Sequence, residues 1–121
     1  MKDKEKLINE AFEISEHIRY IAVYDNDGLS MKQRSVINNV SSNESDKYEE
    51  LLVNPTLIKL ASQRGNIDCG GLEYFIIRYG NFFVLLIPCK NGHVNVGIEL
   101  DENPFLFIEP LNALLRKYNL N

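Results

Sequence analysis

Residues 72–100 read LEYFIIRYGNFFVLLIPCKNGHVNVGIEL, and this stretch decides the fold class. Aromatic and β-branched residues fill three short runs, and such residues favour the half-buried surface of a sheet. Gly80-Asn81 separates the first two runs and residues 89–92 separate the last two, and both connectors suit β-hairpins. We therefore expect three consecutive antiparallel strands, at 72–79, 82–88 and 93–100.

Two further strands are predicted near the N-terminus. Residues 18–24, IRYIAVY, have the composition of a strand, and residues 25–28, DNDG, are a strong turn signal. A return strand is expected at 29–37. Its inner part, KQR at 32–34, is polar, and cationic residues protect a sheet edge from unwanted pairing. This strand is therefore expected to lie at an edge.

Helical patterns fill the remaining segments, because their apolar residues recur at the spacing of one helical face. The helices are expected at 2–17, between Ser42 and Gly65, and at 105–119. The resulting order, α-β-β-α-β-β-β-α in 121 residues, predicts an α+β fold: a five-stranded antiparallel sheet with helices packed on it. With no repeat, linker or low-complexity segment, residues 1–121 should form a single domain.

The middle helix carries one strong break signal, Asn54-Pro55. Proline lacks a backbone donor and restricts the residue before it, so we expect a kink or a restart with Asn54 as the cap. Ser42 or Asn43 would cap the start of this helix, and Gly65 would end it.

Composition excludes several classes of protein. A net charge of −4 argues against a phosphate-backbone binder, so no nucleic-acid partner is expected. The longest apolar run, at 82–88, is too short to span a bilayer. Two cysteines in a chain of this length favour a reducing compartment. We expect a cytoplasmic protein with no targeting segment and no membrane span.

Candidate chemistry is limited to Cys69, Cys89 and His93. Cys69 would need a base such as His93 to act as a nucleophile. The three residues together could hold a metal, but structural zinc generally takes four ligands, with cysteines in close pairs. Cys69-Gly70-Gly71 is more typical of a turn, so we expect no enzyme, no metal and no cofactor.

The element order resembles that of roadblock-type domains, in the wider profilin-like and longin-like group. The resemblance rests on IRYIAVYDNDGL at 18–29 and FFVLLIPCKNGHVNVGIEL at 82–100, and it covers essentially the whole chain. Residues 50–82 also resemble an uncharacterised archaeal group of this architecture. The resemblance implies a non-enzymatic module that dimerises through sheet edges and central helices, and that regulates or scaffolds small GTPases. Asn54-Pro55 departs from the family pattern in the central helix.

A homodimer is also expected from the aromatic residues of the strands. If helices cover only one face of the sheet, a second copy should cover the other, and tyrosine is favoured at interfaces. The candidate interface residues are Leu72, Tyr74, Phe75, Tyr79, Tyr48 and Leu52. The alternative is a small-molecule sensor of the PAS-like or profilin-like kind, with a ligand between sheet and helices near Arg19 and Cys69.

Overall fold

The computed structural model describes residues 2–35 and 37–121. Its centre is a five-stranded antiparallel sheet in the order β2-β1-β5-β4-β3. The strands are β1 (Ile18–Asp25), β2 (Gly28–Gln33), β3 (Phe75–Arg78), β4 (Phe83–Cys89) and β5 (Gly92–Ile98). The α+β class and the order of elements are confirmed, and β2 lies at an edge, as its polar centre predicts.

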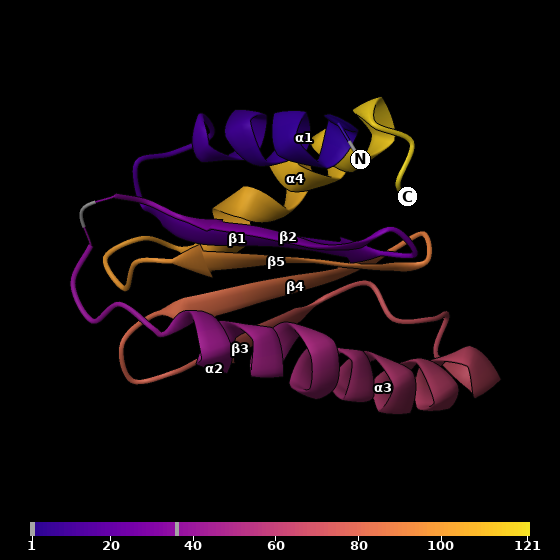
Figure 1. The fold of residues 1–121 in the computed structure, drawn as a ribbon. Coiled ribbons are helices and arrows are strands. Elements are labelled where there is room, and N and C mark those ends of the chain that lie inside the picture. The colour runs from indigo at the N-terminus through magenta and orange to yellow at the C-terminus, as the bar shows by residue number, and fades with distance from the viewer. Residues whose placement is uncertain (1, 36) are drawn as a thin grey trace.

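Helices cover both faces of this sheet (Figure 1). They are α1 (Lys2–Phe12), α2 (Asn43–Tyr48), the π-helical η1 (Glu49–Val53), α3 (Asn54–Asp68), the 3-10 segment η2 (Pro104–Phe107) and α4 (Ile108–Lys117). In Figure 1, α1 and α4 lie above the sheet, and α2 and α3 lie below it. The expectation that a second copy covers a bare sheet face is therefore wrong. A surface for a partner would therefore lie on the outward side of a helix or at an edge of the sheet.

The face under α1 and α4 is a continuous apolar core. Ile21, Val96 and Leu85 lie side by side across β1, β5 and β4, and all three are completely buried. Leu7 of α1 and Leu111 of α4 close over them. Burying each such side chain stabilises the fold by about 1.5–3 kcal/mol.

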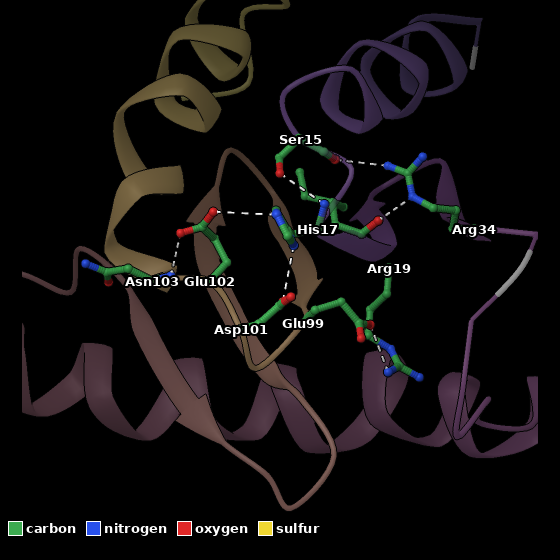
Figure 2. Close-up of polar contacts among 9 residues, drawn as sticks. Ser15, His17, Arg19, Arg34, Glu99, Asp101, Glu102 and Asn103 are labelled. Carbon is green, nitrogen blue, oxygen red and sulfur yellow. Dashed lines mark hydrogen bonds and ion pairs between the residues drawn. The ribbon is translucent and has the colours of Figure 1, made fainter.

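The helix α1 ends at Phe12, earlier than the predicted residue 17. Arg34 explains the early end, because its guanidinium donates to the carbonyl oxygens of Phe12 at 3.1 Å and Ser15 at 3.0 Å. The first bond satisfies a carbonyl at the end of α1, and the second holds the turn that follows it. Its Nε also donates to the Ile18 carbonyl at 2.7 Å, so Arg34 ties the α1–β1 turn to β1 (Figure 2).

Strand β3 is shorter than the predicted 72–79. Gly70 and Gly71 have φ values of 83° and 91°, which favour glycine, and they turn the chain after α3. Residues 72–74 then precede the ladder without joining it.

The segments α2, η1 and α3 follow one another without a gap from residue 43 to 68, and we call them the outer helix. Ser42 caps its start by accepting from the Ser45 amide, as predicted. A new α-helical segment, α3, does begin at Asn54, with Pro55 in its first turn, but Asn54 is itself helical and does not act as the predicted cap. The chain stays helical there because the Asn54 backbone amide donates to the Glu49 carbonyl oxygen, five residues back, in a π-helical turn. This wider turn carries the helix past a proline that cannot donate. The helix also continues through Gly65.

Candidate interaction surface

A completely buried carboxylate, that of Glu50, lies between the outer helix and the sheet. Four donors reach it: the Tyr20 hydroxyl at 2.8 Å, His93 Nε2 at 2.7 Å, Asn95 Nδ2 at 2.7 Å and Asn54 Nδ2 at 2.9 Å. A carboxylate accepts at both oxygens, and these donors occupy both. The network joins β1, β5 and the outer helix, so it sets which side of that helix faces the sheet.

The sequence analysis missed Glu50, which stands among other acidic residues near the start of a helix. The signal that could have revealed it lies in β5. There His93 and Asn95 alternate with Val94 and Val96, so one face of a central strand is polar. Buried polar side chains are ordinarily hydrogen-bonded, so the element that covers this face is expected to supply partners for them.

The most buried positions of the outer helix are not apolar, and the apolar residues on the same side, Leu57 and Ala61, are only half-buried. Its fully buried positions are Asp46, Glu50, Asn54 and Gly65. None of them is apolar, although a surface helix ordinarily turns its apolar stripe inward. Spacings of four, four and eleven residues place all four positions on one side of a helix.

The opposite side of the outer helix carries large apolar side chains. Tyr48, Leu52, Leu60 and Ile67 are each more than half exposed, and we call them the outer row. Their spacings of four, eight and seven residues keep them on one side of the helix. Tyr48 and Leu52 belong to the predicted interface, whereas Leu60 and Ile67 were not among its residues.

The remaining predicted interface residues lie in β3 or next to its ends, at the edge of the sheet. Tyr74 and Tyr79 are exposed, and Leu72 and Phe75 are half-buried. Among the described residues, β3 pairs with β4 on one side and with no strand on the other. Its outer backbone groups are therefore open to a further strand.

A pocket of about 420 Å³ lies between the start of the outer helix and the β3–β4 turn, and we call it the edge pocket. Tyr48, Tyr79 and Phe82 line it with aromatic rings, and Asp46 and Glu49 line it with carboxylates. The rings of Tyr79 and Phe82 meet edge to face, with centroids 5.9 Å apart.

The two carboxylates make the edge pocket electronegative. Burial, followed by the charges of Glu50 and Asp46, raises the pKa of Glu49 to about 7. Burial, followed by the charges of Glu49 and Glu50, also raises the pKa of Tyr79. Asn95 Nδ2 is a weak donor to Glu49, at 3.3 Å. The pocket therefore opposes further negative charge and favours a cation.

Arg19 lies nearby, but its charge is already matched. Its guanidinium pairs with Glu99 at 3.0 Å (Figure 2) and donates to the carbonyls of Asn38 and Asn39 at 2.8 and 2.9 Å. It also lies over the Phe82 ring, 4.6 Å from the centroid. The alternative prediction placed Arg19 beside a ligand, whereas the structure uses it to hold the 37–40 loop.

The structure does not assemble Cys69, Cys89 and His93 into a site. His93 is engaged with Glu50, and the exposed Cys69 thiol donates to Asp68 at 3.4 Å. Burial, followed by the charge of Asp25, raises the pKa of Cys89 to about 11, so its reactive thiolate form is disfavoured. Within residues 2–35 and 37–121, no three His, Cys, Asp or Glu side chains are grouped to hold a metal ion.

Comparisons with known proteins do not assign the chain to a family. No family model matches the chain, and no curated protein sequence matches it. In the part of the chain that the structure describes, no helix has the length and apolar character needed to cross a membrane.

Proposed function

We propose that this chain is a non-enzymatic, dimerising protein-interaction module of the roadblock-like kind. The observation that carries the proposal is the outer helix, which buries the polar residues Glu50 and Asn54 and exposes the apolar outer row. Exposed single apolar residues are ordinary, but a row of large ones along one helix marks an interaction site.

A second copy of the chain is the occupant that suits this surface. The open edge of β3 can pair with a second β3 antiparallel about a two-fold axis, because a two-fold interface uses the same patch on both subunits. Edge pairing supplies main-chain hydrogen bonds, and the outer row supplies apolar area beside it. One contact would then cover both exposed features.

The regulatory part of the proposal, with a small GTPase as the further partner, rests on the family resemblance. A dimer built through β3 would leave the β2 edge of each copy at the two ends of a joined sheet. Those edges carry Lys32 and Gln33, which disfavour further strand addition. The proposed assembly is therefore closed at two copies.

Sedimentation equilibrium tests the dimer. The wild-type protein should sediment at twice the chain mass of 13.9 kDa. Leu60→Glu should shift it to monomer, because a charge in a dry apolar contact is costly to desolvate. Phe75→Lys should do the same from the strand edge.

The matched control is Leu106→Glu, because Leu106 is 61% exposed and Leu60 is 62% exposed. Leu106 lies in η2, outside the outer helix and β3. The Leu106→Glu variant should therefore remain a dimer. A wild-type protein that stays monomeric, or a dimer that survives Leu60→Glu and Phe75→Lys, would overturn the proposal.

A further inference from the structure

The edge pocket combines carboxylates with aromatic rings. Its carboxylates, Asp46 and Glu49, come from the first turns of the outer helix, and its rings come from Tyr48, Tyr79 and Phe82. No lysine or arginine is among the residues that line it. Aromatic rings attract cations through their negative faces, and carboxylates attract them by charge.

The two carboxylates differ in how far their hydrogen bonds are satisfied. Asp46 accepts from Gln33 at 2.9 Å and from the Ser41 hydroxyl at 2.5 Å. Among the described residues, the Glu49 carboxylate has only the long contact from Asn95, although it is half-buried. Glu49 is thus the carboxylate of the edge pocket with acceptor capacity to spare.

An unpartnered buried oxygen lies next to Glu49. Asn95 directs its Nδ2 to both Glu49 and Glu50, which leaves its Oδ1 completely buried without a hydrogen-bond partner among the described residues. Buried acceptors in this state ordinarily have a donor. Asn95 is not among the residues that line the edge pocket, so this buried oxygen adjoins the site without forming part of its wall.

We propose that the edge pocket binds the guanidinium group of an arginine side chain presented by a partner protein. The planar guanidinium carries five donors in a fixed fork, and it stacks on aromatic faces. Glu49 would accept its N–H groups, and the rings of Tyr48 and Tyr79 would flank it. The molecule already uses this pairing once, where Arg19 stacks on Phe82 and pairs with Glu99.

This inference rests on the proposed function, because it makes the edge pocket the point where an interaction module recognises its partner. It adds the chemistry of that partner: a protein segment with an exposed arginine. The net charge of −4 favours approach of such a basic segment, and it does so most at low salt.

Amide shifts in a titration of 15N-labelled protein test the inference without knowledge of the partner. The probes are N-acetyl-arginine amide, its uncharged isostere N-acetyl-citrulline amide, and N-acetyl-lysine amide. The arginine probe should shift the amides of Glu49, Gly80 and Asn81 with a saturable curve. The citrulline probe should bind at least about tenfold more weakly, because it lacks the charge. The lysine probe should also bind more weakly, because an ammonium lacks the fork.

The variant Glu49→Gln should weaken arginine binding by about tenfold or more. Its matched control is Glu44→Gln, which removes an exposed carboxylate from the same helix outside the edge pocket and should leave binding unchanged. The dispersion of the amide spectrum reports whether each variant is folded. The comparison of the three probes uses only the wild-type protein, so it tests the inference even if Glu49→Gln does not fold.

The outcomes separate this inference from the dimer. A dimer that shows no saturable arginine shifts, or that binds arginine and citrulline equally, overturns the edge-pocket assignment and leaves the dimer standing. Equal binding of lysine overturns the assignment to guanidinium. A monomer that binds arginine selectively supports the edge-pocket assignment and overturns the dimer.

Discussion

On one face of the sheet, under α1 and α4, the buried side chains form an apolar core around Ile21, Leu85 and Val96. On the other face, under the outer helix, the centre is the carboxylate of Glu50 with its four donors. The buried hydrophobic residues of the sheet on that second face are Tyr20, Ala22, Val84 and Leu86.

The difference shows that one sheet can hold its two helical layers by two kinds of interaction. Apolar packing is non-directional and grows with buried area, so burial holds α1 and α4 on their face. Hydrogen bonds to a buried carboxylate are directional, so the Glu50 network orients the outer helix. With Glu50 and Asn54 held inward, the outer row of the outer helix remains exposed.

The largest expected effect follows from removing Glu50. Glu50→Ala leaves His93, Tyr20 and two amides buried without their acceptor, and should cost about 3–5 kcal/mol of unfolding free energy. Urea denaturation measures the total loss. Limited trypsin digestion should also cut the outer helix of this variant after Lys59 and Arg64, whereas the wild-type protein should resist cleavage there. An outer helix that stays protected would show that the network does not hold it.

The second prediction compares the two faces directly. Leu85→Ala, in the α1/α4 core, should cost about 2–5 kcal/mol because it leaves a cavity that the core cannot fill. Leu57→Ala, at a half-buried position of the outer helix, should cost about 1 kcal/mol or less, since less area is lost. Urea denaturation of both variants is the measurement. Equal losses would contradict the division between the faces.

The third prediction concerns pH and Glu49. Its carboxyl has a pKa raised from 4.5 to about 7, because burial and the charges of Glu50 and Asp46 disfavour ionisation. The folded state therefore holds a proton that the unfolded state releases between pH 4.5 and about 7. Stability from this group should fall as pH rises through that window, by roughly 1–2 kcal/mol after allowance for solvent screening.

Glu49→Gln removes this titration. Its free energy of unfolding should vary less with pH across the window than that of the wild-type protein, while Glu44→Gln should follow the wild type. If the wild-type protein gains stability between pH 5 and 7 and Glu49→Gln gains equally, other groups dominate and the assignment to Glu49 is wrong.

The smallest expected effect lies on the exposed surface of the outer helix. Arg64 and Asp68 form an ion pair four residues apart, at 2.6 Å, with both side chains largely exposed. Asp68→Asn should leave the free energy of unfolding nearly unchanged, because solvent screens an exposed ion pair. A loss comparable to that of Glu50→Ala would mean that surface charges, and not the buried network, hold this helix.

The sequence predicted the parts of the fold that depend on local pattern. Alternation and turn residues located the strands, and polar residues at 32–34 marked β2 as an edge. Ser42 was correctly expected among the caps. These features depend on residues that are close in the chain, so their signal is visible without tertiary structure.

The features that the sequence did not predict depend on distant residues. Glu50 meets partners from β1 and β5, and nothing near it in the chain shows that it is buried. The π-helical turn at Asn54 was missed because proline ordinarily ends a helix. The edge pocket joins the outer helix to the β3–β4 turn, which only the fold brings together.

Hydrogen–deuterium exchange measured as a function of protein concentration tests the central claim most directly. The account predicts that protection in the outer helix and in β3 rises with concentration, while protection in α1, α4 and β1 stays constant. That result would place a second copy on the outer row and the β3 edge. Protection that is independent of concentration, or that rises at η2 instead, would contradict the account.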